Sequence, residues 1–216
     1  MTETAAIADP RLRQLLSDAT AWRLLGLLFE RPREGWWQEV EALGRSVADP
    51  DIQAAADAAR EEAGEGLHLA ILGPGGPVSP REVTYRGMED PGRIVADINA
   101  FYEAFAFRPE TEEAPDHLAV ETGFVGYLRL KEAYARARGS EDEAEVAAKA
   151  ATRFCEAHLS TLAWPVADRI ATTDVRYLTL AAAALARLSG PRPETAATVK
   201  ARPPRCEHCP MDCDLE

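Results

Sequence analysis

The residues best suited to chemistry in this chain are an Asp-His pair, Asp116 and His117, followed one helical turn later by Glu121. On a helix, residues four apart share one face, so Glu121 would lie on an apolar-facing row with His117 as its natural partner. A carboxylate in such a row is costly unless it is paired. Together with His158 from a later helix, these side chains could hold a divalent ion and an activated water, as in a metal-dependent hydrolase.

A structural interpretation of the same pair needs no chemistry. Asp is a favoured N-cap residue, and Asp116 follows Pro115, so we favour a capping role for it. His117 would then lie in the first turn, where the helix dipole disfavours the protonated imidazole and predicts a neutral, hydrogen-bonding group. The pair also lacks the H-E-x-x-H spacing of zinc hydrolases, and the chain has no G-x-S-x-G, Walker or dinucleotide-binding pattern.

The elements that must position these residues are predicted to be helices. The chain has 216 residues, 46% of them hydrophobic, and no segment alternates like a strand. Apolar periodicity predicts helices over residues 12–29, 36–47, 52–63, 94–105, 116–138, 140–162 and 175–188. Ser140 and Glu143 form a candidate capping box, and Trp164-Pro165 is expected to interrupt the helix that they start. We therefore expect an all-α, single-domain helical bundle.

One long loop should divide this bundle. Residues 73–80 contain three prolines and three glycines, which break both helix and strand. We expect residues 1–188 to form one helical domain with a Gly/Pro-rich mid-chain loop near 73–92, and residues 189–216 to form a Pro-rich tail. Long loops inside compact domains often carry function, so the residues that this loop leads into are candidates for a site.

The tail carries a second candidate for chemistry. Cys206, His208, Cys209 and Cys213 form a short Cys/His tract with the spacing C-x2-C-x3-C. Such tracts can bind a metal. A structural zinc site normally has a second, distant ligand pair, and an iron-sulfur cluster usually has four thiolates. We expect no permanently bound cofactor, with a metal at this cluster as the open alternative.

The charge of the chain limits the classes of partner that it can bind. The formal net charge is −12, from 36 acidic against 24 basic residues, which argues against a nucleic-acid partner and against an anionic membrane surface. No apolar run of 18 residues occurs and the N-terminus lacks an apolar signal region. We expect a cytoplasmic protein without stable membrane insertion.

Half of the net charge lies in one stretch, residues 81–121. It contains ten acidic and four basic residues, a net of −6, interleaved with aromatic side chains. This composition suits a partner segment that is half apolar and half arginine. A solvated acidic face over an aromatic core would give the same composition.

Four segments together resemble the TorD/DmsD/NarJ family of redox-enzyme maturation chaperones. They are Leu72-Gly73-Pro74, Pro80-Arg81-Glu82-Val83-Thr84-Tyr85, Ile98-Asn99-Ala100-Phe101-Tyr102 and Pro115-Asp116-His117-Leu118-Ala119-Val120-Glu121-Thr122-Gly123-Phe124. The later run from Phe154 to Trp164 fits the same pattern, so the resemblance spans about residues 12–188. It is most specific at the Pro-Asp-His-Leu block.

This resemblance implies a non-enzymatic, all-helical chaperone. Members of the family bind the twin-arginine signal peptide and the apo form of a molybdenum-containing oxidoreductase subunit, and delay export until the molybdenum cofactor is inserted. Carried over to this chain, the contacts to signal peptide and client are Pro80, Glu82, Tyr85, Asp116, His117 and Glu121. A twin-arginine signal also complements the acidic, aromatic stretch found above.

The chain departs from the family pattern at three positions. Gly123 stands where a second acid is usual, Val125 where a methionine is expected, and Arg81 where an aromatic residue is common.

The alternatives to a chaperone are the metal-dependent hydrolase and a helical adaptor without a signal-peptide role. A monomer and a domain-swapped dimer are both compatible with the helices and the long loop.

Overall fold

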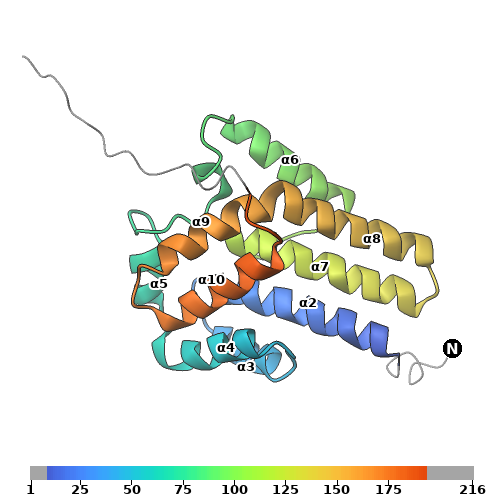
Figure 1. The fold of residues 1–216 in the computed structure, drawn as a ribbon, viewed down its shortest axis with the longest axis horizontal. Helices are drawn as coiled ribbons and strands as arrows, with labels where there is room; N and C mark the ends of the chain where they lie inside the picture. Colours follow the sequence, from blue (N-terminus) through green and yellow to red (C-terminus); the bar gives the residue numbers. More distant parts are fainter. Residues whose placement is uncertain (1–8, 194–216) are drawn as a thin grey trace, which may run out of the picture.

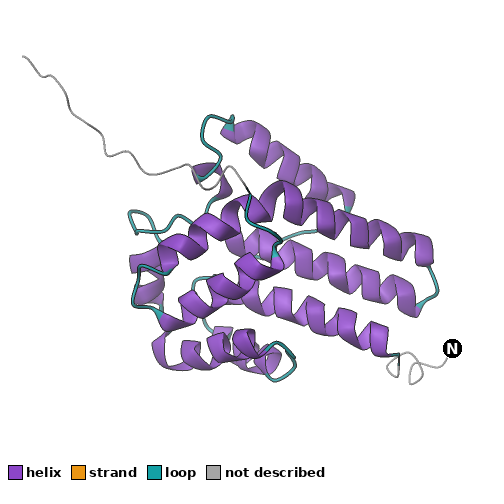
Figure 2. Cartoon of the chain, viewed as in Figure 1, coloured by secondary structure: helices purple, strands orange, loops and turns teal. Residues whose placement is uncertain are grey.

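The helices of this protein pack into an all-α bundle. The computed structural model describes residues 9–193, and in that part of the chain it contains helices and loops but no strand (Figure 2). The α-helices are α2 (Pro10–Leu28), α3 (Trp36–Gly44), α4 (Pro50–Glu62), α5 (Glu65–Leu72), α6 (Pro91–Ala104), α7 (Leu118–Ala137), α8 (Glu141–Phe154), α9 (Ser160–Ile170) and α10 (Arg176–Leu188). The predicted fold class is confirmed.

Helix α7 is the centre of the bundle. It packs along α2 on one side and along α8 on the other, while α10 packs on α4 and α9 (Figure 1). Close approach of α2 and α7 depends on glycine: a Cβ at Gly26 would lie 3.0 Å from the Ala119 carbonyl oxygen, and one at Gly126 would lie 3.1 Å from the Arg23 nitrogen. The two helices run antiparallel, so the end of α2 lies at the start of α7.

Aromatic side chains fill the core between α6, α7 and α8. The Phe124 ring packs against Tyr102 and Phe154, each at a centroid distance of 4.8 Å, and Phe101 packs edge-on against Phe154. Phe124 and Phe154 are fully buried. Phe101 and Tyr102 of the acidic stretch 81–121 thus stabilise the core, as edge-to-face pairs do in other proteins.

The predicted helices are present, with two corrections. The periodicity missed α5 (Glu65–Leu72), a short helix that begins between two glycines. Pro165 was expected to interrupt a helix, but it lies inside α9. Burial of Leu162, Val166 and Ile170 on the inner face of α9 outweighs the cost of a proline, which is about 3 kcal/mol in a helix interior.

Two further predictions were wrong in detail. The Ser140 side chain makes no capping hydrogen bond, so the capping box does not form. The helix that begins there changes at Cys155–Leu159 into a π-helix, whose wider turn carries His158.

Among the described residues, none of the helices combines the length and the apolar character that a membrane span requires.

Candidate functional site

The Gly/Pro-rich loop reaches the start of α7 and is fixed there by backbone hydrogen bonds. The Glu82 nitrogen donates to the Asp116 carbonyl at 2.9 Å, and the Leu118 nitrogen donates to the Pro80 carbonyl at 2.8 Å. Arg81 and His117 thereby form an isolated antiparallel bridge. A short 3-10 helix, Glu82–Thr84, follows immediately. The predicted site residues from the loop and from the Pro-Asp-His-Leu block are therefore neighbours.

Asp116 anchors this loop rather than capping α7. Its carboxylate is fully buried, accepts a 2.6 Å hydrogen bond from Arg81 Nε and accepts another from the Val83 nitrogen at 3.3 Å. The expected N-cap role of Asp116 is thus wrong. His117 is the N-cap residue, because its Nδ1 accepts a hydrogen bond from the Ala119 nitrogen at 3.2 Å. A charge-assisted pair such as Arg81–Asp116 requires the arginine that replaces the common aromatic.

The His117 imidazole is neutral at physiological pH, as predicted. Burial, helped by the nearby cationic forms of His68 and Arg81 and opposed by Asp116, lowers its pKa to about 4. The cause is therefore chiefly desolvation, not the helix dipole. With Nδ1 acting as an acceptor, Nε2 carries the proton, and it lies 3.8 Å from a Glu113 carboxylate oxygen.

Glu121 faces other carboxyl groups instead of His117. It is fully buried, and burial raises its pKa well above the ordinary value, with further increases from Glu82 and Asp116. Neither carboxyl oxygen has a hydrogen-bond partner of good geometry in the described chain. The expected His117–Glu121 pairing is therefore wrong, and burial beside two other carboxyl groups favours the protonated form of Glu121.

Glu82 is the hub that connects the loop to the π-helix. Its fully buried carboxylate accepts from Arg86 Nε at 2.5 Å and lies 3.2 Å from His158 Nδ1. The other ring nitrogen of His158, Nε2, lies 3.3 Å from Asp97 on α6. The contact between Glu82 and His158 joins residues that are 76 apart in the chain. We call Glu82, Asp116 and Glu121, with Arg81, Arg86 and His158, the carboxyl anchor.

The geometry of the carboxyl anchor gives no support to the metal-dependent hydrolase. Asp116 is bound to Arg81, His117 caps α7, and His158 faces Glu82, so their free atoms do not converge on one point. Within residues 9–193, no group of three or more His, Cys, Asp or Glu side chains is arranged to hold a metal ion. The Cys206, His208, Cys209 and Cys213 tract lies outside the described residues.

Four of the six predicted contact residues are turned into the protein. Glu82, Asp116 and Glu121 are 0% exposed and His117 is 3% exposed, while Pro80 and Tyr85 are half-buried. Tyr85 donates its hydroxyl to the Ser79 carbonyl at 2.8 Å and so stabilises the same loop. Contact between these six residues and a client stays a prediction; in this conformation they hold the loop against α7.

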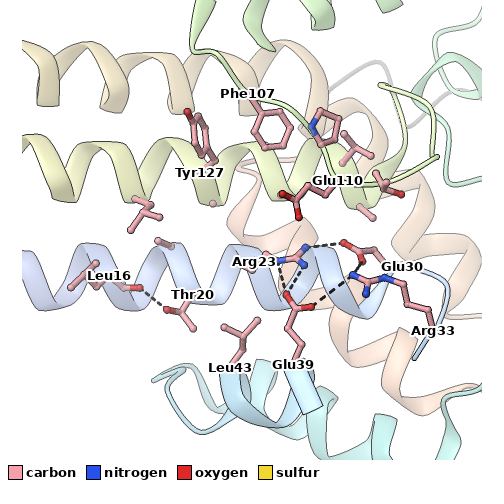
Figure 3. Close-up of a pocket in the computed structure, with 18 residues that line it drawn as sticks. Leu16, Thr20, Arg23, Glu30, Arg33, Glu39, Leu43, Phe107, Glu110 and Tyr127 are labelled. Carbon is pink, nitrogen blue, oxygen red and sulfur yellow. Dashed lines mark hydrogen bonds and ion pairs between the residues drawn. The ribbon is translucent and has the colours of Figure 1, made fainter. Parts of the chain in front are cut away.

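The opposite side of α7 bears an open groove of about 570 Å³, shared with α2 (Figure 3). Apolar and small side chains line most of it. They are Leu16 and Ala19 from α2, Leu43 from α3, Ala119, Val120, Gly123, Gly126, Tyr127 and Leu130 from α7, and Phe107 and Pro109 from the linker before α7. We call this feature the α2–α7 groove. Leu16 and Leu130 are exposed although they are apolar, at 37% and 51%.

Ionic side chains gather at one end of the α2–α7 groove. Arg23 pairs with Glu30 at 2.8 Å and with Glu39 at 2.6 Å, and Arg33 lies within 4.0 Å of both carboxylates (Figure 3). These four charges balance one another. Glu110, exposed on the rim, forms no ion pair with any described residue, so the groove lining carries one uncompensated negative charge.

The linker is shaped so that Phe107 reaches the groove. Ala106 has φ of 55°, a left-handed conformation unusual for a residue with a Cβ, and it reverses the chain directly after α6. Phe107 then packs against Phe124 and Tyr127 at centroid distances of 5.2 and 5.3 Å. The Tyr127 hydroxyl donates to the Phe105 carbonyl at 3.0 Å. One wall of the groove is therefore rigid.

The sequence analysis missed the α2–α7 groove. A signal for it was present on α7: beside the core-facing Phe124, Val125 and Leu128, a second stripe of Gly123, Tyr127, Leu130 and Tyr134 follows helical spacing. Two separate apolar stripes on one helix indicate a face that the core does not need. Of the acidic linker residues, Glu110 lines the same groove as Gly123, Tyr127 and Leu130.

Comparison with known proteins gives two matches. Residues 31–164 match the family described as the nitrate reductase delta subunit. The chain is also 30% identical over 165 residues to the selenate reductase assembly chaperone protein of Thauera selenatis, a match that covers 74% of this chain and 79% of that protein. The family match includes the loop, the carboxyl anchor and the α7 side of the groove.

Proposed function

Because the chain belongs to the nitrate reductase delta subunit family, which is the TorD/DmsD/NarJ family of redox-enzyme maturation chaperones, we propose that it is an assembly chaperone for a molybdenum-containing oxidoreductase. Its client is the apo catalytic subunit, together with the twin-arginine signal peptide of that subunit. Binding in the cytoplasm holds the client back from export while the molybdenum cofactor is inserted. The role is one of recognition, not of bond breaking.

The observation that supports peptide recognition best is the α2–α7 groove. A twin-arginine signal combines two arginines with a moderately apolar segment. The groove offers an apolar floor beside an uncompensated carboxylate, Glu110, with the exposed Glu112 and Glu113 following in the same linker. Apolar burial would supply most of the affinity, and the carboxylates would steer the arginines and fix the direction of the peptide.

The direction of the bound peptide follows from the two ends of the groove. Glu30, Glu39 and Glu110 lie at the end formed by the start of α7, and Leu16 and Leu130 lie at the other end. The arginines would therefore lie near Glu110, with the apolar segment running toward Leu130. The eleven residues of α7 from Val120 to Leu130 span about 15 Å at the usual helical rise, which is room for about three turns of a docked helix.

The carboxyl anchor supports this function indirectly. It fixes the start of α7 and, through Asp116, the end of the acidic linker that forms the rim of the groove. A rim that is already ordered loses less conformational entropy on binding. Glu82, Asp116 and Glu121 therefore act as positioning residues for the groove, in the conformation described here.

Calorimetry with synthetic peptides tests the proposal. The protein is titrated with a panel of twin-arginine signal peptides from molybdenum oxidoreductases of the same organism, and with copies in which both arginines are glutamine. We expect at least one peptide to bind, its glutamine copy to bind more weakly, and the difference to shrink as salt is raised. Failure of every peptide to bind at low salt would contradict the proposal.

A second experiment tests the maturation role with the intact client. The client catalytic subunit is expressed with and without this chain, and its molybdenum content is measured after purification. We expect a higher molybdenum content when the chain is present. Equal content in both preparations would exclude a role in cofactor insertion, whatever the peptide titrations show.

A further inference from the structure

The α2–α7 groove contains one glycine whose role the fold does not explain. Gly26 and Gly126 are needed for helix packing, since a Cβ on either would lie within 3.1 Å of backbone atoms of the facing helix. Gly123 lies between them along the contact between α2 and α7, and it also lines the groove. A Cβ at Gly123 would meet no heavy atom within 4 Å. Packing therefore permits a larger residue at this position.

A glycine inside a helix is unfavourable unless something requires it. Gly123 lies in the interior of α7, where it loses more conformational freedom on folding than any other residue type would. Its backbone has no positive φ, so no turn or cap demands glycine. The remaining consequence of the missing side chain is space, because Gly123 lines the groove and a Cβ there would meet no heavy atom within 4 Å.

Two restrained side chains line the groove together with Gly123. Tyr127 is held by its hydrogen bond to the Phe105 carbonyl and by a tilted ring contact with Phe107. The Arg23 guanidinium is held by Glu30 and Glu39. Because these groups are restrained by partners of their own, the recess exists before any ligand arrives.

We infer that Gly123 forms a recess that accepts one bulky apolar side chain of the client signal segment, and so determines which segments this chaperone accepts. The inference rests on the proposed function, and it names a residue that selects the client. The uncompensated Glu110 carboxylate on the rim attracts the arginines of that segment, and the recess receives an apolar residue on their far side. Leucine, isoleucine, methionine and phenylalanine have the required size and polarity.

The substitution Gly123→Leu fills the recess and tests the inference. Gly66 supplies a matched control, because it is also a helical glycine with no atom within 4 Å of a Cβ, but it lies on α5 outside the groove. For a bound twin-arginine peptide, we expect Gly123→Leu to weaken binding at least tenfold and Gly66→Leu to change it less than twofold. Gly123→Ala should fall between them.

Folding of the variant is checked independently. Leucine has a higher helix propensity than glycine, and its Cβ would meet no heavy atom within 4 Å, so the melting temperature of Gly123→Leu should equal or exceed that of the unmodified protein. If the unmodified protein binds a peptide and Gly123→Leu binds it equally well, the recess is overturned and the proposed function stands. If the unmodified protein binds none of the peptides, both are overturned.

A complementary change in the peptide identifies the side chain that enters the recess. Each apolar residue of the bound peptide is replaced by alanine in turn, and every copy is titrated into both the unmodified protein and Gly123→Leu. We expect one position at which alanine weakens binding to the unmodified protein and restores binding to Gly123→Leu. If no position shows this reversal, Gly123 does not act as a recess for a single side chain.

Discussion

Helix α7 presents two faces that differ in almost every physical property. Its inward start lies at the carboxyl anchor, in which Glu82, Asp116 and Glu121 are fully buried. Asp116 is hydrogen-bonded to the loop residue Arg81, and Glu82 contacts His158 of the π-helix. Its outward face carries the α2–α7 groove, with exposed apolar residues and a carboxylate that has no ion pair in the described chain. The residues that stand out most in the sequence form the inward face.

A cluster of acidic residues can therefore serve to hold a loop in place instead of contacting a partner. Removing carboxylates from water costs free energy, which Arg81, Arg86 and His158 offset, while the raised pKa of Glu121 favours its uncharged form. A groove for a partner requires the opposite, namely apolar surface left open and charge left unpaired. The predictions below separate the two faces by experiment.

The largest effect is expected from breaking the carboxyl anchor. Asp116→Ala removes the buried partner of Arg81 and frees the Val83 nitrogen, so we expect the free energy of unfolding to fall by about 1.5–3 kcal/mol. Urea denaturation measures this. The exposed Glu112→Ala in the same linker is the control, with a change within about 0.5 kcal/mol. A loss below about 1 kcal/mol in Asp116→Ala would show that the anchor is not structural.

Two glycines of α7 separate the effect of the α2–α7 helix contact from that of the groove. A methyl group at Gly126 meets the backbone of α2 at 3.1–3.2 Å, so Gly126→Ala should lower the free energy of unfolding by about 1–3 kcal/mol. Gly123→Ala meets nothing, so it should raise that energy by about 0.5–1 kcal/mol through helix propensity. Urea denaturation of both variants should give opposite signs. The same sign in both would contradict the placement of Gly123 over open space.

The proton on Glu121 should make stability depend on pH. A carboxyl whose pKa is raised by folding stabilises the protein at low pH, and that contribution is lost as pH rises from the unfolded value, about 4.3, through the folded one. Glu121→Gln carries no titrating group. The unfolding free energy of Glu121→Gln minus that of the unmodified protein should therefore increase with pH.

Taking this difference removes the contributions of His68 and His117, whose pKa values of about 4 have the opposite effect and are shared by both proteins. Urea denaturation at several pH values between 5 and 9 provides the measurement. A difference that stays constant over this range would mean that Glu121 is not held in its protonated form by Glu82 and Asp116.

The smallest effect is expected at the rim of the groove. Glu110→Gln removes an exposed charge, so a bound twin-arginine peptide should lose two- to fivefold in affinity at low salt, about 0.5–1 kcal/mol. The loss should vanish at high salt. Glu103→Gln, on α6 and outside the groove lining, is the matched control and should leave binding unchanged. Equal losses in both variants would indicate general attraction to an acidic protein.

Much of the fold could be predicted from the sequence, because most of its helices have an apolar stripe of the right period. Helix α5 was not predicted because it is short and because Gly64, its N-cap, and Gly66, in its first turn, weaken the local helical signal. The helix break predicted at Pro165 was wrong because sequence patterns weigh a proline by its local effect on the helix. The buried residues of α9 on either side of Pro165 stabilise the helix through tertiary packing. Tertiary burial outweighed propensity in both cases.

The candidate site was predicted less well, for a physical reason. The sequence analysis identified Glu82, Asp116, His117 and Glu121 as candidate site residues. Their hydrogen-bond and ion-pair partners could not be predicted from sequence spacing. The Glu82–His158 contact joins residues 76 apart, and the Arg81–Asp116 contact joins residues 35 apart. The groove depends on two helices that meet only in the folded chain, so its residues carried no motif.

Chemical-shift mapping of backbone amides tests the central claim most directly, that recognition takes place on the outward face of α7. The nitrogen-15-labelled protein is titrated with a twin-arginine peptide that binds it. The largest shifts are predicted at Thr20, Gly123, Gly126, Tyr127 and Leu130, with the amides of residues 80–86 nearly unchanged. Large shifts confined to residues 80–86 and 116–121, with none along 123–130, would contradict the account and make the buried carboxyl anchor the binding surface.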